Sequence, residues 1–347
     1  MRRGPRSAAR GWHTPRFATS GMRPRVQRDR LASYLVILDP RTRDLTEFAS
    51  YLSTISVAGF EVIVAELPDA FDENDRVLRW VGQHVRIRPQ HRSFSGTIDP
   101  LHVAMNVASC DKVIVADERV RYSVDALHEI NVLLDAHEVV EPQDYLDPLP
   151  WWGGIDAGRM LLHRGIEPLP DHGATFGFRR GVWRGFRAID AGAATGDPPR
   201  RLASQGAEVF AALEVFVRRN PPLLGEWIRQ RPRYADSDFS LPLKSAFFFG
   251  ILPIALVLSL LGGPRLAVCY AAAISLASLA LAMRGRVGAA QFFPRRTCLY
   301  SPLWVLERSL SVYWALLRRL PLLSPEPRRI IHVIPSVREG HGRAMRK

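Results

Sequence analysis

Cysteine is scarce in this chain, and its cysteines are far apart. Cys110, Cys269 and Cys298 are the three in 347 residues, and they show no paired spacing. The sequence therefore offers neither a disulfide framework nor a cysteine-ligated zinc site, and it fits a reducing compartment. The chain is long enough to bury a core as one large domain or two smaller ones.

Acidic residues are almost absent from the first thirty positions. Residues 1–30 hold nine arginines and one acid, Asp29, so they carry +8 of the formal net charge of +13. Interleaved with glycine, proline and serine, this segment is typical of a disordered, solvated tail. It lacks the apolar region of a secretory signal, whereas a transit peptide would share its composition. Residues 325–347 form a second basic tail.

Motifs for nucleic-acid binding are also lacking. Neither an aromatic pattern nor a fold signature accompanies the arginine-rich tail, so we expect no nucleic-acid partner. The remaining positive charge lies mostly around apolar segments of the C-terminal half. An anionic membrane surface is therefore the expected partner.

Two uncharged apolar runs follow one another in the C-terminal half. Residues 245–261 and 266–283 contain no charged side chain, and each is close to the ~20 residues needed to cross a hydrocarbon core. A four-residue turn separates them, so residues 245–283 are predicted to form a transmembrane hairpin. Two buried helices of a soluble core are the alternative. Basic outer flanks predict a multi-pass protein of the cell membrane with a cytoplasmic catalytic domain and cytoplasmic termini.

Residues 299–320 are apolar but interrupted by charge. Trp304, Tyr313 and Trp314 alternate there with Glu307, Arg308 and two further arginines. This composition predicts an amphipathic helix lying in the membrane interface. A third membrane crossing is the alternative, and it would place Glu307 and Arg308 near the middle of the bilayer.

Short apolar runs alternate with helix-length segments between residues 31 and 240. Strands are expected at 34–38, 60–65, 85–87, 112–116 and 138–140, and helices at 45–57, 100–108 and 124–134. This alternation predicts an α/β domain with a mostly parallel sheet. Because ligands of such sheets bind beyond the carboxyl ends of the strands, attention falls on Asp117, Glu118 and Arg119. Adjacent carboxylates suit a hard cation such as Mg²⁺ or Mn²⁺; a solvated acidic turn is the competing interpretation.

The order of motifs resembles the membrane-attached family 2 glycosyltransferases. The motifs are, in chain order, VIVADERVRYS (113–123), EPQDYLDPLPWW (141–152), GATFGFRR (173–180) and QRPRY (230–234), followed by the apolar hairpin. The resemblance covers roughly residues 34–283. It implies a GT-A fold for the cytoplasmic domain at 31–240. It also implies hexosyltransferase-type transfer from a nucleotide-sugar donor to a lipid-linked or polysaccharide acceptor of the cell envelope.

The donor motifs of that family are degraded in this sequence. The resemblance maps the Asp-x-Asp motif, which holds the metal and the donor diphosphate, to Asp117, Glu118 and Arg119. Asp117 and Glu118 are thus the implied ligands of Mg²⁺ or Mn²⁺. Arg119, in place of the second aspartate, either pairs with the diphosphate directly or abolishes donor binding. Glu66 replaces the acidic pair that grips the nucleoside, and Gly96 is expected at a backbone turn near the donor.

The catalytic-base motif is degraded as well. An inverting transfer needs a carboxylate that takes the proton from the acceptor hydroxyl. The resemblance places this base near Thr195, and Asp197 is the nearby candidate. An ordinary turn aspartate is the competing interpretation of Asp197.

Two aromatic motifs are candidates for the acceptor side. Gln230, Arg233 and Tyr234 correspond to the family's QxxRW motif, which implies contacts with acceptor and diphosphate. A basic juxtamembrane helix meeting lipid headgroups is the alternative. Trp151 and Trp152 either floor a sugar site or fill a core.

Two hypotheses about function follow. The first is a membrane-anchored glycosyltransferase acting at the cytoplasmic face. The second is a catalytically impaired relative that serves as a partner or scaffold in envelope glycan assembly, and it is motivated by Arg119, Ala65 and Thr195 at positions where the family has acidic residues.

Overall fold

The structure is a computed structural model. It describes residues 30–38, 45–66, 83–86, 98–166, 175–185, 198–238 and 242–319. The two predicted tails lie outside these residues, apart from Arg30. The Arg30 guanidinium donates hydrogen bonds to the carbonyls of Ser56 and Phe60 and so ties the start of the described chain to the first helix and strand.

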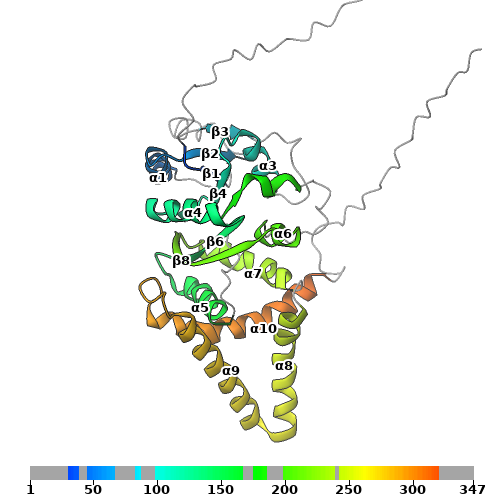
Figure 1. The fold of residues 1–347 in the computed structure, drawn as a ribbon. Helices are drawn as coiled ribbons and strands as arrows, with labels where there is room; N and C mark the ends of the chain where they lie inside the picture. The colour runs from blue at the N-terminus through cyan, green and yellow to red at the C-terminus, as the bar shows by residue number, and fades with distance from the viewer. Residues whose placement is uncertain are drawn as a thin grey trace, which may run out of the picture.

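A mixed eight-stranded sheet forms the upper part of the molecule (Figure 1). Its order is β3-β2-β1-β4-β7-β6-β8-β5. The strands are β1 (Ser33–Leu38), β2 (Glu61–Glu66), β3 (Gln83–Arg86), β4 (Lys112–Asp117), β5 (Val120–Arg121), β6 (Val139–Leu146), β7 (Phe176–Arg179) and β8 (Val209–Arg219). The pairs β1–β2, β2–β3, β1–β4 and β6–β8 are parallel, whereas β7 is antiparallel to β4 and β6 and β5 is antiparallel to β8.

Both faces of this sheet are covered. The sheet domain contains α1 (Thr46–Val57), α3 (Ile98–Val107), α4 (Val124–Ala136), α5 (Trp151–Ile166), the 3-10 helix η2 (Arg180–Gly185), α6 (Pro198–Ser204) and α7 (Leu224–Asp238). One core packs α1 and α4 on one face, and a second core packs α3, η2 and α6 on the other. The predicted α/β class is confirmed, and each expected strand and helix except β6 is present within two residues of its expected bounds.

The β6 strand is longer than the sequence pattern predicts. We expected it at 138–140, but it continues to Leu146 and buries Glu141, Gln143 and Asp144. Such residues are ordinarily exposed. Neighbouring groups satisfy part of their hydrogen-bonding capacity: the Thr175 hydroxyl donates to Asp144 Oδ1 at 2.6 Å, and the Gln143 side-chain amide donates to the Asp144 carbonyl at 3.0 Å.

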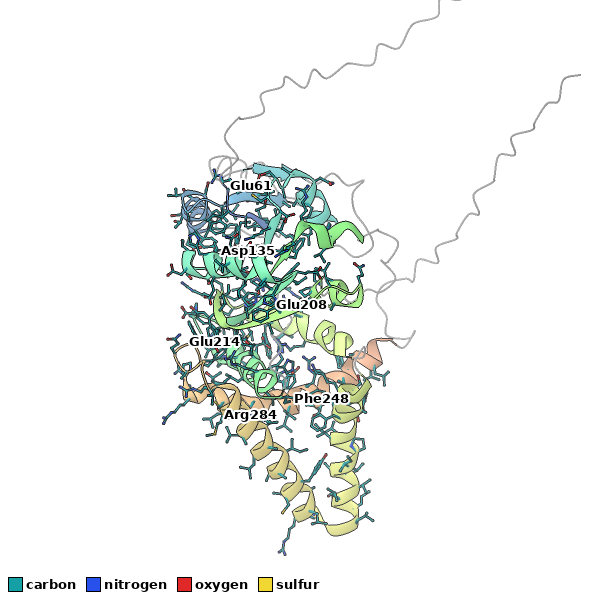
Figure 2. All side chains as sticks on the ribbon, viewed as in Figure 1. Glu61, Asp135, Glu208, Glu214, Phe248 and Arg284 are labelled. Carbon is teal, nitrogen blue, oxygen red and sulfur yellow. The ribbon has the colours of Figure 1, made fainter. Side chains whose placement is uncertain are left out.

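Two long apolar helices form a V below the sheet domain (Figure 1). They are α8 (Pro242–Gly262) and α9 (Pro264–Gly285), and both are long and apolar enough to cross a membrane. Figure 2 places Phe248 of α8 and Arg284 of α9 at the ends of these helices nearest the sheet domain. In each helix only 11% of the apolar window is buried. The alternative of two buried core helices is therefore wrong for this structure.

Helix α10 (Tyr300–Arg319) runs across the open end of the V (Figure 1), preceded by the 3-10 helix η4 (Arg295–Leu299). One face of α10 is buried and includes Trp304, Val305, Arg308, Val312 and Ala315. The opposite face exposes leucines and a tryptophan at helical spacing, namely Leu303, Leu306, Leu310, Trp314 and Leu317. The helix is thus amphipathic as predicted, and its charged residues Glu307 and Arg308 belong to the side that packs on protein.

Glycines on α5 allow the sheet domain and the lower helices to approach closely. A Cβ on Gly158 would lie 2.7 Å from the Ser301 backbone nitrogen of α10. A Cβ on Gly165 would overlap the Leu281 carbonyl of α9, and one on Gly285 would overlap the Leu161 carbonyl of α5. Because the backbones themselves are in contact at these points, α5, α9 and α10 behave as one packed unit.

We predict that Gly158→Ala destabilises the protein. The added methyl group meets backbone atoms that cannot rotate away, and overpacking of this kind costs about 1–3 kcal/mol. The expected result is a lower melting temperature of the detergent-purified protein. Gly225→Ala is the matched control, because Gly225 lies in α7 with nothing within 4 Å of its added Cβ. An unchanged melting temperature for Gly158→Ala would contradict the close packing.

Candidate active site

The candidate site lies where β4 ends. Asp117 is the last residue of β4, and the turn Glu118–Arg119 leads directly into β5. Because β5 pairs antiparallel with the end of β8, Val120 stands opposite Arg219. The Asn220 amide then donates to the Arg119 carbonyl at 2.8 Å. The topology therefore brings the predicted acidic turn against the connection between β8 and α7.

Arg219 joins two carboxylates at this corner. Its Nη2 lies 2.8 Å from Asp117 Oδ2, and its Nη1 lies 3.5 Å from Asp144 Oδ2. The second oxygen of Asp117 accepts the Arg119 amide at 2.9 Å, and the second oxygen of Asp144 accepts the Thr175 hydroxyl. Both carboxylates are thus held in fixed orientations by protein groups.

Arg119 is held from two sides. Its Nη2 lies 3.2 Å from Glu226 Oε2, in the first turn of α7, and its Nε lies 3.5 Å from Glu118 Oε1. The Glu226 carboxylate is favourably placed at a helix N-terminus. About a fifth of the Arg119 side chain stays exposed, at 22%, so a ligand can reach its guanidinium.

A buried tyrosine lies behind the carboxylates. The Tyr122 hydroxyl is buried and has no hydrogen-bond partner among the described residues. Burial raises the pKa of this phenol well above its ordinary value, and the nearby charges of Asp144, Asp117 and Glu141 raise it further. Tyr122 therefore stays protonated and presents a neutral wall to the acidic group.

The tryptophan pair lies at the start of α5, next to the same corner. The Trp152 indole donates to the Pro222 carbonyl at 3.0 Å, in the connection between β8 and α7 that also contacts Arg119. Trp151 packs edge-on against Trp152, with ring centroids 5.7 Å apart, and 59% of it is exposed. Trp152 thus braces the connection, while Trp151 offers an aromatic surface to solvent.

The remaining predicted residues divide into three groups. The Glu66 backbone ends β2 at the same carboxyl edge as Asp117, with β1 between the two strands. Gln230, Arg233 and Tyr234 lie on α7, where Gln230 is half-buried and the other two side chains are outside the described part of the chain. Gly96 and Asp197 also lie outside the described residues.

A buried ion pair fastens α7 to α5 and α10. Arg231 is 7% exposed, and its Nη2 lies 2.7 and 2.8 Å from the two oxygens of Asp156 on α5. The Trp227 indole donates to the same carboxylate at 2.8 Å and stacks under the Arg231 guanidinium at 4.2 Å. Arg231 Nη1 also lies 4.0 Å from Glu307 of α10.

We did not predict several of these residues as site residues, although the sequence contains signals for some of them. Asp144 lies inside the quoted EPQDYLDPLPWW segment, and Arg231 lies inside the QRPRY motif as one of its unspecified positions. Arg219 ends a long apolar run and precedes Asn-Pro-Pro, which marks a strand end. Asp156 and Trp227 carried no signal beyond their residue type.

The described carboxylates do not fit a divalent cation as they stand. Within the described residues, no group of three or more histidine, cysteine, aspartate or glutamate side chains is arranged to hold a metal ion. A metal bound at Asp117 would have to displace Arg219, and it would leave that guanidinium beside a second positive charge. The expected ligand pair, Asp117 and Glu118, is instead neutralised by arginine.

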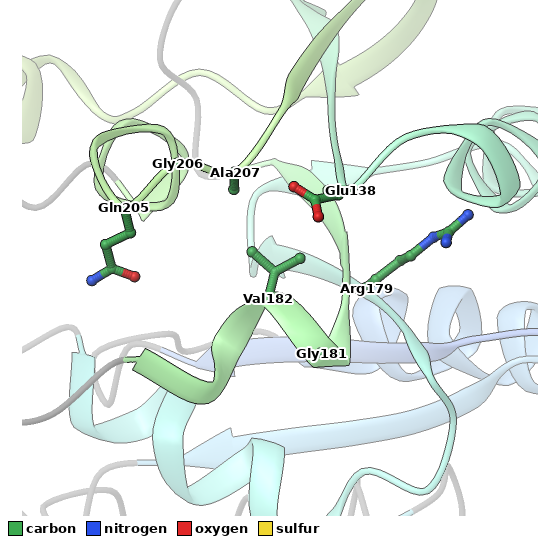
Figure 3. A pocket seen from close by; sticks show the side chains of 7 residues that line it. All are labelled: Glu138, Arg179, Gly181, Val182, Gln205, Gly206 and Ala207. Carbon is green, nitrogen blue, oxygen red and sulfur yellow. The ribbon is translucent and has the colours of Figure 1, made fainter.

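A separate hollow of about 570 Å³ lies at the opposite edge of the sheet (Figure 3). Its lining includes Glu138, Arg179, Val182 and Gln205. Both charged groups serve the fold: Glu138 accepts the Glu208 amide, and Arg179 donates to the Leu134 carbonyl that ends α4. None of the described residues that line this hollow is a predicted donor or acceptor residue.

Comparisons with known proteins give likenesses to solved structures only. No protein-family model and no curated protein matches the chain. Among solved structures, the chain is similar to the mannosyltransferase PcManGT from Pyrobaculum calidifontis in complex with GDP-Man and Mn²⁺. The two sequences are 17% identical, the match covers 81% of this chain and 87% of that chain, and the TM-score is 0.48. The chain is also similar to glucosyl-3-phosphoglycerate synthase from Mycobacterium tuberculosis, with 13% identity, 60% and 78% covered, and a TM-score of 0.40.

Both likenesses are below 20% in identity and below 0.5 in TM-score, so neither carries a conclusion about this chain. What the site does must come from the residues of this chain.

We predict that Asp156→Asn destabilises the protein strongly. The substitution removes the close counter-charge of buried Arg231 and leaves it only Glu307 at 4.0 Å, and breaking a buried pair from one side costs about 3–5 kcal/mol. Chemical denaturation of the purified protein measures the loss. Asp135→Asn is the matched control, since Asp135 pairs with Lys112 at 2.7 Å but is 70% exposed. Equal losses for the two variants would contradict the structural role of Asp156.

Proposed function

We propose that the chain is a membrane-anchored glycosyltransferase. It transfers a sugar from a nucleotide-sugar donor to a lipid-linked or polysaccharide acceptor at the cytoplasmic face of the cell membrane. The observation that carries the proposal is the corner at Asp117, Glu118 and Arg119. It lies at the carboxyl edge of the sheet, and its contacts with Glu226 connect it through α7 to the helices below.

The described residues suit the binding of a nucleoside diphosphate. Arg119 and Arg219 present guanidinium groups, each about a fifth exposed, at the edge where ligands of α/β sheets bind. Guanidinium groups form paired, charge-assisted hydrogen bonds with phosphate oxygens. The exposed ring of Trp151 is a surface on which a sugar or isoprenoid acceptor can lie.

In the proposed transfer, an acceptor hydroxyl attacks the anomeric carbon of the donor sugar. The glycosidic bond to the acceptor forms as the bond to the nucleoside diphosphate breaks, and the diphosphate leaves with the electron pair. Asp197 is the proposed base that takes the hydroxyl proton. Arg119 and Arg219 stabilise the negative charge on the leaving diphosphate.

The membrane assignment is part of this proposal. Helices α8 and α9 cross the bilayer, and α10 lies in the interface with the exposed face of Leu303, Leu306, Leu310, Trp314 and Leu317 toward the lipid. Arg284 and Arg286 at the end of α9 then meet anionic headgroups on the cytoplasmic side. Helices α5 and α7 then connect the sheet domain to the helices at the membrane surface.

A second candidate function is favoured by one observation. Asp117 and Asp144 are both paired with the guanidinium of Arg219. A chain that keeps the fold but has lost turnover would tolerate this arrangement and would act as a scaffold in envelope glycan assembly.

We predict that a nucleotide-sugar donor stabilises the detergent-purified protein against heat. A ligand at ten times its dissociation constant adds about 1.4 kcal/mol, which corresponds to a few degrees for a domain of this size. Differential scanning fluorimetry with UDP-, GDP- and TDP-sugars measures the shift. Absence of a shift with every donor contradicts the enzyme proposal. Asp197→Ala separates the candidates: an enzyme loses sugar transfer, whereas a scaffold keeps its cellular role.

We also predict that Arg265, in the first turn of α9, lies across the membrane from the sheet domain. In a variant whose three cysteines are replaced by serine, Arg265→Cys should react with a membrane-impermeant maleimide in intact cells. Asp135→Cys, at an exposed site of the sheet domain, should react only after permeabilisation. Labelling of both cysteines from the same side would contradict the hairpin.

A further inference from the structure

Arg219 stands where a cation would have to bind. Its two Nη atoms face Asp117 Oδ2 at 2.8 Å and Asp144 Oδ2 at 3.5 Å. A divalent ion held by these carboxylates would need the same oxygens, at about 2.0–2.2 Å for Mg²⁺ or similar ions. The guanidinium and the metal ion therefore compete for one position.

The backbone fixes Arg219 in this place. Arg219 is opposite Val120 in the β5–β8 pair, and the next residue, Asn220, donates its amide to the Arg119 carbonyl. The other oxygens of the two carboxylates are also used, by the Arg119 amide and by the Thr175 hydroxyl. Moving Arg219 aside would thus break an arrangement held at several points.

Positive charge surrounds the turn on its other sides too. Arg121 donates to the carbonyls of Glu118 and Val120, and it pairs with Glu47 at 2.6 Å. Arg119 lies between Glu118 and Glu226. Every carboxylate of the turn for which a partner is described faces a guanidinium. The positive groups that could contact the phosphates of a ligand at this turn are therefore arginines.

We infer that Arg219 is an internal cation that replaces the divalent metal ion, so that the site binds its nucleoside diphosphate without metal. The inference rests on the proposed function for the nature of the donor. The exclusion of metal by Arg219 is a property of the chain alone, and it can be measured without any donor. Failure of one part is therefore distinguishable from failure of the other.

Titration with MnCl₂ alone tests the exclusion. Electron paramagnetic resonance of full-length protein in detergent reports free Mn²⁺ directly. The wild type should show no saturable binding that depends on Asp117, so wild type and Asp117→Asn should give the same curve. Arg219→Ala should gain one saturable Mn²⁺ site, and adding Asp117→Asn to that variant should remove it. Arg218→Ala is the matched control, because Arg218 faces exposed Asp147 instead.

Two results overturn the inference. One is saturable Mn²⁺ binding to the wild type that Asp117→Asn abolishes. The other is the absence of any Mn²⁺ site in Arg219→Ala when circular dichroism shows that this variant is folded. If Arg219→Ala fails to fold, the comparison of wild type with Asp117→Asn still tests the inference, because Mn²⁺ binding that Asp117→Asn abolishes would overturn it.

Donor binding supplies the independent second readout. A donor that stabilises the protein should do so equally with EDTA and with Mn²⁺, and Arg219→Ala should weaken its binding about tenfold or more in EDTA, as expected for the loss of one charge-assisted contact. Stabilisation only in the presence of Mn²⁺ overturns the inference but leaves the proposed function standing. No stabilisation under either condition overturns the donor part along with the proposed function, whereas the Mn²⁺ titration still decides whether Arg219 excludes metal.

Discussion

The lower half of the molecule depends on the interaction between the buried carboxylate of Asp156 and two side chains of α7. This carboxylate is the shared partner of Arg231 and Trp227, so one side chain of α5 fixes the whole orientation of α7. On other faces the same helix meets α9 and α10 through glycines, at distances that leave no room for a side chain. Helix α5 therefore connects the sheet to the apolar helices by two different means, ionic on one side and steric on the other.

This arrangement explains why a buried charge is kept where an apolar contact would suffice for stability. Replacing a buried ion pair by apolar residues is often neutral or stabilising. We therefore assign the Asp156–Arg231 pair the role of orienting α7 relative to α5. Asp156 accepts from two donors of α7 at fixed angles, and Arg231 reaches Glu307 of α10 as well. A purely apolar contact would let α7 slide along its axis, whereas the hydrogen bonds to Asp156 fix the position of α7 along that axis.

The same balance of charge decides the character of the candidate site. The sequence presents an acidic turn after a strand, and that composition suggests a metal site. In the fold, Asp117 meets Arg219, which is 102 positions later in the chain, and Arg119 of the turn itself pairs with Glu226, which is 107 positions later. The chemistry of the turn is thus set by its partners across the sheet.

How much was predictable follows from the same distinction between local and distant signals. The strands β1, β2 and β4 and the apolar helices were predictable because runs of apolar residues report local structure directly. The polar half of β6 was not, since Glu141, Gln143 and Asp144 look exposed until β8 pairs along them and Thr175 contacts Asp144. Asp117, Glu118 and Arg119 were predicted to follow a strand, and the structure has them at the end of β4; their role in donor binding stays a prediction. Arg219 was missed because its role depends on a strand pairing that no local pattern encodes.

Helix α7 ties these observations into one mechanical unit. Its first turn holds Glu226 against Arg119 at the end of β4, and little more than one turn later Arg231 contacts Asp156 and faces α10. A rise of 1.5 Å per residue puts the two contacts about 8 Å apart along one helix. A displacement of α10 would therefore be transmitted through Arg231 and α7 to Glu226, and with it to the guanidinium of Arg119. If α10 lies in a membrane interface as proposed, the position of the proposed phosphate-binding arginine is coupled to the depth of α10 in that interface.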